Sequence, residues 1–321
     1  MAGCRRVRRL ARRYDAGEPG RGSRQRDRPT VKTLEIVAIL GAFSGVIYAL
    51  MGLGLVVLYR TANLVNFAQG DIATVGLFVG ISLLDSGWPY WIVVIVVILV
   101  GALLSGGLGG LFRWRWFSDR DPVELVVVTV GVSLIIQGIE SNLTGGKAYT
   151  FPSMDQHTVG SIASVTISGT DLISVGAAVA IFLFIGALYK FTSIGKAMRA
   201  IAENAAEASA LGLRVRDITT LSWCVAGALA AIAGLFVAPV YSLTTSSIDV
   251  LLIYGFAVVV VGGFESAAGA AAVGLGVGVL QSIIGVYLSS TFVLPVLVGG
   301  MVIALLIAPN GLLAKRRVER V

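Results

Sequence analysis

The sequence predicts an all-α, polytopic helical membrane protein with about eight or nine transmembrane helices. Of its 321 residues, 56% are hydrophobic and only 13% are charged, whereas a soluble domain carries roughly a quarter of charged residues. From residue 34 onward, apolar runs follow one another, and most reach the length of about 17–25 residues that crosses a hydrocarbon core. The composition excludes a soluble globular domain, a disordered chain and a disulfide scaffold.

Nine apolar segments are predicted to be helices, because backbone groups in lipid must be hydrogen-bonded internally and the segments lack the period of barrel strands. One of them, 249–263, is short, so a tilted, a partial and a re-entrant path stay open for it. The segments are 34–58, 64–84, 90–112, 122–144, 171–190, 218–240, 249–263, 266–288 and 291–308.

The charges of the loops predict the topology. With nine crossings and a cytoplasmic C-terminus, the cytoplasmic side holds 13 of the 14 basic residues that follow residue 32, and the outer side holds only Lys147. Basic loops favour the cytoplasmic side, so residue 34 is predicted to lie outside. The thirteen are Arg60, Arg113, Arg115, Arg120, Lys190, Lys196, Arg199, Arg214, Arg216, Lys315, Arg316, Arg317 and Arg320.

Residues 1–32 are predicted to be a basic, disordered tail ahead of a transmembrane domain over 33–317. The tail has eleven Lys and Arg against three acids, whereas the remainder has a net charge of −1 and no character of a nucleic-acid binder. The topology sends this tail outside, although so basic a segment belongs in the cytoplasm. Either one run does not cross, or the tail is a gene-start artefact and translation begins near Val31. We favour the artefact. Mass spectrometry of the intact protein would contradict it by detecting a peptide from residues 1–30.

The largest outer loop, 145–170, is either a docking surface for an external partner or a simple connection between two helices. Within it, Thr158–Ser168 alternates weakly and predicts a small hairpin. The loop contains His157, the single histidine, which has no partner for binding a metal. Cys4 and Cys224 lie far apart and form no metal or redox motif. We therefore expect no metal and no cofactor.

The most polar intramembrane stretch is NLVNFAQGD, which ends at Asp71. An acid at the centre of a transmembrane helix costs about 2.5–3.5 kcal/mol, so Asp71 must be paired, near the interface or facing water. Arg60, Asn66 and Gln69 are the nearest candidates to pair with it. A helix that starts at Gly70 would put Asp71 at its positive end. Two interpretations stay open: a translocation pathway or hinge, and a buried network that fixes packing. Both involve Asn66, Gln69, Gly70 and Asp71.

Four more polar residues lie near the apolar segments, and one of them is Gln137. Glu124 follows Asp121 and Pro122, a pattern typical of a helix start, so we expect it to cap a helix. Glu140 lies near the outer end of its segment and Glu265 in a short inner turn, so both are expected to contact water.

Small residues dominate 262–286, and Gly274 and Gly278 form a GxxxG step. Such residues let helices approach closely in lipid. We therefore predict a helix-packing role for Gly262, Gly263, Gly274 and Gly278.

The cytoplasmic loop 191–217 predicts one short amphipathic helix between Lys196 and Leu211, ended by Gly212. Such a helix fits a groove on a soluble partner. The alternative is a helix lying on lipid, against which its small apolar face and its acids argue. The apolar side holds Ala197, Ile201, Ala205, Ala208 and Leu211, and another side holds Arg199, Glu203 and Glu207.

No catalytic constellation is visible, so the sequence predicts a transport subunit rather than an enzyme. The nearest approach to a P-loop is Gly195-Lys196, which is followed by Ala197 and lacks the earlier glycine. Any ATP hydrolysis is therefore expected on a separate chain.

Three blocks of this sequence resemble the branched-chain amino acid permease family of ABC importers, in its LivH-type form. They are GLVVLYRTANLVNFAQG with Asp71, GKAMRAIAENAAEASALGL from Gly195, and VVVVGGFESAAGAAAVGLGV from Val258, followed by Ala308-Pro309-Asn310-Gly311-Leu312. The resemblance covers about residues 31–317. One departure is Gln69-Gly70-Asp71, where the family usually has His-Gly-Glu, which removes a titratable group and shortens the acid.

The resemblance implies a type II-like ABC importer permease fold in the bacterial plasma (inner) membrane. It implies a second, LivM-like permease subunit, two cytoplasmic ATP-binding subunits, and an extracytoplasmic solute-binding protein that delivers an amino acid or a related small solute. It also implies that the loop 191–217 couples to the ATPases, through Gly195, Arg199, Glu203, Ala205, Glu207 and Gly212.

The alternative function is an ion-gradient-driven secondary transporter or channel that acts without an ATPase. Such a carrier usually has paired or central ionisable residues, and only Asp71 qualifies here. Glycine at Ala205 should abolish ATP-dependent uptake in the first case and spare gradient-driven flux in the second. A membrane scaffold or enzyme is the weakest alternative. The sequence leaves open a branched-chain amino acid, urea, an amide or another amino acid as substrate, and a homodimer or a heterodimer.

Overall fold

The computed structural model describes residues 31–112, 121–153, 158–162, 165–309 and 311–313. Contacts divide the chain into two units, Met1–Leu34 and Glu35–Val321, and the account below concerns the second. Several residues used above for the sequence predictions lie outside the described residues: the tail 1–30, Arg113, Arg115, Arg120, His157, Asn310, Lys315, Arg316, Arg317 and Arg320.

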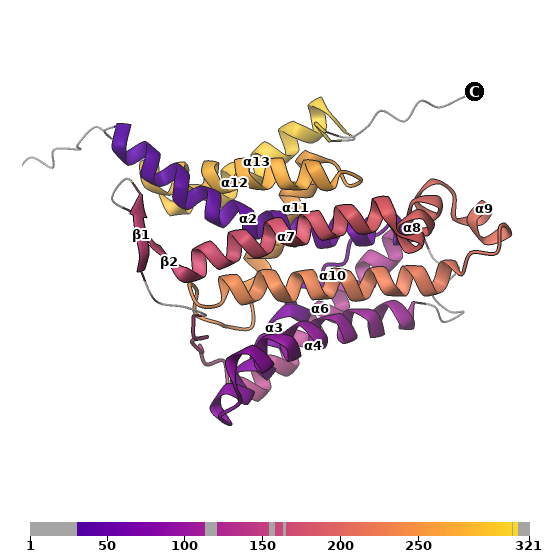
Figure 1. Cartoon of the computed structure of the whole chain (residues 1–321), viewed down its shortest axis with the longest axis horizontal. Coiled ribbons are helices and arrows are strands. Elements are labelled where there is room, and N and C mark those ends of the chain that lie inside the picture. The colour runs from indigo at the N-terminus through magenta and orange to yellow at the C-terminus, as the bar shows by residue number, and fades with distance from the viewer. Residues whose placement is uncertain (1–30, 113–120, 154–157, 163–164, 310, 314–321) are drawn as a thin grey trace, which may run out of the picture. The chain divides into compact units, whose positions relative to one another are not determined.

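The described residues are almost entirely helical, which confirms the predicted all-α class (Figure 1). Seven of these helices are long and apolar enough to cross a membrane, and α3 and α11 are shorter. The helices are α2 (Val31–Ala62), α3 (Gln69–Asp85), α4 (Tyr90–Leu111), α6 (Pro122–Thr144), α7 (Gly169–Phe191), α8 (Ser193–Glu203), α9 (Ala205–Ala210), α10 (Val215–Val237), α11 (Ser247–Gly262), α12 (Ala267–Tyr287) and α13 (Ser290–Ile307).

A small antiparallel hairpin, β1 (Thr158–Ile162) and β2 (Val165–Ser168), precedes α7, as the weak alternation predicts. Ser168 then caps α7 by a capping box: its side chain accepts from the backbone of Asp171, whose carboxylate accepts from the backbone of Ser168. In Figure 1 this hairpin and the pair α8 and α9 lie at opposite ends of α7.

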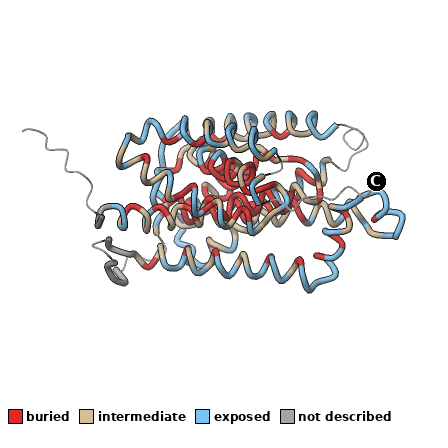
Figure 2. The backbone as a smooth tube through the Cα atoms, turned by 90° about the horizontal axis from the view of Figure 1, so that it is seen from above, coloured by how far each residue is buried: buried red, intermediate tan, exposed pale blue. Residues whose placement is uncertain are grey.

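A tightly packed part of the core lies between α4 and α10, next to α3. A Cβ added at Gly101 of α4 would lie 2.8 Å from the carbonyl oxygen of Gly227 in α10, so these backbones touch. The Ser105 hydroxyl donates to the carbonyl of Trp223 at 2.7 Å, which ties the same two helices together. Figure 2 shows buried residues concentrated along the middle of the helices.

A second close contact joins α12 to α2. A Cβ added at Gly274 would lie 2.6 Å from the Cβ of Ala49, so these two residues are in direct contact. Gly278 lies in the same way against Gly41 and Gly45. The GxxxG step of α12 therefore faces small residues of α2, a geometry that lets helices pack closely in lipid.

The loop 191–217, which the charge pattern predicts to be cytoplasmic, differs from the prediction of a single helix between Lys196 and Leu211. The chain breaks at Asn204, which ends α8 and caps α9 by accepting from the backbone N–H groups of Ala206 at 3.0 Å and Glu207 at 3.2 Å. Asparagine is among the best N-cap residues, because its side chain satisfies the free N–H groups of a new helix. Gly212 has a φ of 85°, where the backbone leaves the helix.

Candidate functional site

The site begins with a non-helical segment between α2 and α3, residues 63–68, in which Leu64, Asn66 and Ala68 are buried and Asn63 is exposed. Irregular backbone at membrane depth is tolerated only where protein or a cavity surrounds it, so its polar groups need partners. The backbone N–H of Ala68 donates to the Asn66 carboxamide oxygen at 3.0 Å, and that of Phe67 donates to the Thr129 hydroxyl of α6 at 3.1 Å. The helix α3 then starts at Gln69 and places Asp71 in its first turn.

Asp71 is completely buried and is bridged to a second acid through an amide. The Gln137 side-chain nitrogen of α6 donates to Asp71 at 2.8 Å and to Asp249 at 3.0 Å. Asp249 lies in the first turn of α11, so the starts of α3 and α11 meet at one amide. We call Asp71, Gln137 and Asp249 the carboxylate–amide cluster.

The local partners predicted for Asp71 are wrong. Arg60 donates instead to the backbone carbonyl of Glu265, at 2.9 Å from its Nε, and lies over the ring of Tyr189 at 5.0 Å from the centroid. Gln69 points to Met51, 3.4 Å from both its carbonyl oxygen and its sulfur. The real partner, Gln137, is 66 positions away in sequence, so proximity along the chain cannot reveal it.

Asn66 and Gln69 are fully buried, and Gly70 packs against the backbone of Ile248 at the start of α11. The predicted pathway residues thus surround the meeting point of α3 and α11. Asp249 belongs to this point as well, through its bond to Gln137. Among the residues that the structure describes, no group of three or more His, Cys, Asp or Glu side chains is arranged to hold a metal ion.

One face of α6 carries a stripe of polar residues. Thr129, Ser133, Gln137 and Glu140 recur at steps of three or four, which places them on one side of a helix. This side faces the segment 63–68 and α3, whereas Val123 and Leu134 on other sides are more than 60% exposed. This spacing was the sequence signal that could have revealed the site.

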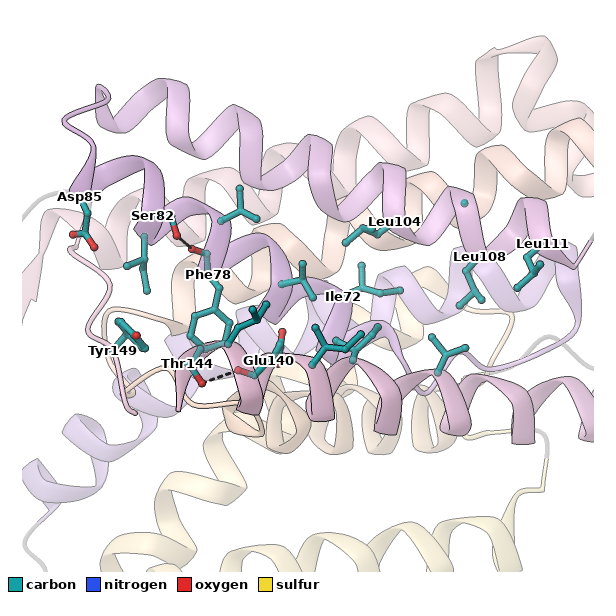
Figure 3. Close-up of a pocket in the computed structure, with 18 residues that line it drawn as sticks. Ile72, Phe78, Ser82, Asp85, Leu104, Leu108, Leu111, Glu140, Thr144 and Tyr149 are labelled. Carbon is teal, nitrogen blue, oxygen red and sulfur yellow. Dashed lines mark hydrogen bonds between the residues drawn. The ribbon is translucent and has the colours of Figure 1, made fainter. Parts of the chain in front are cut away.

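Glu140 is buried, with 5% exposure, and this overturns the expectation that it contacts water. Within the described residues, neither of its carboxylate oxygens has a hydrogen-bond partner. It follows Gln137 by nearly one turn and lines a cavity of about 910 Å³ between α3, α4 and α6. Figure 3 shows Glu140 and Thr144 facing Phe78 of α3.

A second, smaller cavity of about 330 Å³ lies between α2, α11, α12 and the connection from α10. Tyr48 and Tyr254 stack in its wall with ring centroids 4.4 Å apart, and the Tyr48 hydroxyl donates to Gln281 at 2.6 Å. These contacts hold the wall together across three helices.

The residues assigned to ATPase coupling gather on α8, α9 and the turn that follows. Gly195 is buried against the backbone of Leu188 and Tyr189, which seats α8 on the end of α7. The others are exposed on this end of the chain: Arg199, Glu203, Ala205, Glu207 and Gly212. Leu211, expected on the apolar side, is 83% exposed.

Seven apolar helices of membrane-crossing length among the described residues indicate a multi-pass membrane protein. The family model described as "Branched-chain amino acid transport system / permease component" matches residues 37–308, and the chain belongs to this family. It is therefore a permease subunit of the ABC importer type and a multi-pass protein of the bacterial inner membrane.

Several curated relatives match over nearly their whole length. The high-affinity branched-chain amino acid transport system permease protein LivH of Escherichia coli (strain K12) is 26% identical over 88% of this chain and 96% of its own. The probable permease LivH of Methanocaldococcus jannaschii is 33% identical over 82% of this chain and 87% of its own. BraD of Pseudomonas aeruginosa is 26% identical over 88% and 96%.

Proposed function

We propose that this chain, paired with a second, LivM-like permease, forms the membrane path of an ATP-driven importer for branched-chain amino acids or a related small solute. The substrate class is supported by the relatives, whose names describe high-affinity branched-chain amino acid transport. Two separate cytoplasmic ATPase chains would supply the energy, and an extracytoplasmic binding protein would deliver the solute.

The observation that carries the proposal is the carboxylate–amide cluster. The first turns of two short helices, α3 and α11, meet at one amide of α6. Discontinuous helices of this kind form the binding sites and moving parts of many transporters. Asn66, Gln69, Gly70 and Asp71 would then belong to the pathway or its hinge, and the movement of α6 relative to α3 and α11 would open and close the path.

The coupling surface would be α8 with α9. These helices are exposed at the end of α7, and Gly195 allows α8 to pack directly on that helix. Arg60 connects α2 to Tyr189 in α7 and to Glu265 at the turn before α12. A displacement of α8 by an ATPase would therefore reach α2 and α12 through few contacts.

The experiment is a pull-down from gently solubilised native membranes, with a tag after Val321 and mass spectrometry of the partners. We expect a second permease, two kinds or two copies of P-loop ATPase, and a solute-binding protein. The ligand of that binding protein then identifies the substrate. Recovery of this chain alone from intact membranes would contradict the importer proposal.

A control for coupling is the replacement of Ala205, in the exposed first turn of α9, by glycine. In the importer, this change should abolish ATP-dependent uptake while the chain still accumulates in the membrane. Uptake that persists and follows an ion gradient would contradict the requirement for an ATPase.

A further inference from the structure

We infer that the cavity beside α6 takes the ammonium group of an amino acid substrate at Glu140. The inference rests on the proposed importer function and narrows its substrate class: an amine-bearing amino acid is favoured over a neutral solute such as urea or an amide.

The first observation is that Glu140 is buried without a partner. Its residue exposure is 5%, and both carboxylate oxygens lack hydrogen-bond partners among the described residues. An ionised carboxylate away from water is stable only when it is paired and hydrogen-bonded. An incoming ammonium group carries both the missing charge and three N–H donors.

The second observation is the charge of the cavity wall. Among the residues that the structure describes, those that line it include two acids, Glu140 and Asp85, and neither Lys nor Arg. The carboxylate–amide cluster adds two more acids close by, because Gln137 precedes Glu140 by nearly one turn of α6. This side of the chain therefore favours a cation.

The third observation is the apolar remainder of the wall. Aliphatic side chains of three helices line the same cavity as Glu140, among them Ile72 of α3, Leu104 of α4 and Ile136 of α6. They offer the surface that the aliphatic part of a branched-chain amino acid needs. The volume of about 910 Å³ lies within the range of about 300–1,000 Å³ that small-molecule sites have.

The cavity also has the length of a passage. It follows α3 from Ile72 to Asp85, about 20 Å at 1.5 Å per residue. Its outer end carries the polar residues Ser82, Asp85, Thr144 and Tyr149, as Figure 3 shows. Glu140 thus lies between a polar outer entrance and the carboxylate–amide cluster, at the place where an entering amine would first meet a buried charge.

The test uses the complete complex, reconstituted in liposomes with ATP inside and the loaded binding protein outside. Uptake of radiolabelled L-leucine and of urea is measured beside ATP hydrolysis for wild type, Glu140→Gln, Glu140→Asp and the control Ser141→Ala. Ser141 is the exposed neighbour of Glu140 on the same helix. Glutamine keeps the size of the side chain and removes its charge, so the assembled complex should persist.

We expect Glu140→Gln to lower leucine uptake at least tenfold while stimulated ATP hydrolysis stays within twofold. Aspartate should restore part of the uptake, and Ser141→Ala should match wild type. A merely structural role would lower uptake and hydrolysis together.

Three results would overturn the inference while leaving the importer standing. The first is leucine uptake by the Glu140→Gln variant that equals that of wild type. The second is ATP-driven uptake of urea in place of leucine. The third is loss of the second permease from the Glu140→Gln complex, which would make the carboxylate a contact between subunits. Absence of any ATP-driven uptake by wild type would instead contradict the proposed function itself.

Discussion

The helices α10 and α6 have the same length of 23 residues and the same mean hydropathy of 2.0, yet they pack in opposite ways. In α10, 67% of the residues in its most apolar 18-residue stretch are buried, whereas in the corresponding stretch of α6 only 6% are buried. Small residues of α10, such as Gly227 and Ala230, let it lie directly on its neighbours. The inner face of α6 is polar, and its outer sides carry large aliphatic residues.

Hydropathy therefore locates the membrane helices but does not distinguish the tightly packed helices from the loosely packed ones. At Gly227 the backbone of α10 lies directly against the backbone of Gly101 in α4, and a Cβ added there would clash with it. The contacts of α6 are side-chain hydrogen bonds and the partly buried side chains Leu125, Val126, Val132 and Ile136, beside a cavity. Packed interiors resist continuous deformation, so a movement that opens a path is expected at α6 rather than at α10.

The largest effect is expected from Gly227→Val in α10. A Cβ at this position would meet the carbonyl oxygen of Gly101, which cannot rotate away, so we expect a cost of about 3 kcal/mol, at the upper end for overpacking. The matched change is Gly138→Val in α6, where a Cβ has open space. Thermal unfolding of the purified complex should show a lower Tm for the first variant only. Equal Tm values would remove the distinction between the two helices.

The next effect is expected from Gln137→Leu. It leaves Asp71 and Asp249 without their shared donor, at a cost of about 1–3 kcal/mol for an unsatisfied buried group. We expect at least a tenfold loss of substrate uptake, because the two helix starts lose their connection. Asn142→Leu, on an exposed side of α6, serves as the control in the same uptake assay. Normal uptake by the Gln137 variant would mean that the carboxylate–amide cluster is not needed for transport.

A smaller effect is expected from Arg60→Lys. Lysine keeps the charge but loses the fork that reaches the Glu265 carbonyl and the planar group over Tyr189. We expect a loss of about 1 kcal/mol, the size of one cation–π contact, and a two- to threefold weaker stimulation of ATP hydrolysis. Arg216→Lys, at an exposed position of α10, should change neither quantity. Unchanged stimulation in the Arg60 variant would remove this residue from the coupling route.

The smallest effect is expected from Asn204→Ala, between α8 and α9. Loss of the N-cap should cost about 1 kcal/mol locally and lower the amount of ATPase recovered with the complex about threefold. The control is Ser209→Ala, at an exposed position in α9. Full recovery of the ATPases by the Asn204 variant would show that the bend between α8 and α9 is not part of the docking surface.

Much of the fold follows from the sequence, because hydropathy and chain length decide where a membrane helix lies. The predicted segments coincide with the helices to within a few residues, except that α3 starts at Gln69 instead of residue 64. The break at Asn204 was missed because strong helix formers on both sides hide one good capping residue.

The site was harder to predict, since its members come from separate helices. Gln137 lies 66 positions from Asp71 and 112 positions from Asp249, and only helix packing brings the three residues together. Glu140 was assigned to water by its position near a helix end, but the cavity wall encloses it. The polar spacing along α6 was visible in the sequence, and it identifies the face but not what lies opposite.

The polar stripe on α6 has a consequence for any movement of α6 along its axis relative to α3 and α11. One helical turn is a translation of about 5.4 Å, and it exchanges residues that are three or four positions apart. Such a ratchet of α6 past α3 and α11 would replace the amide of Gln137 by the hydroxyl of Ser133 in one direction and by the carboxylate of Glu140 in the other. The register of a single helix thereby sets how many negative charges meet between the two helix starts.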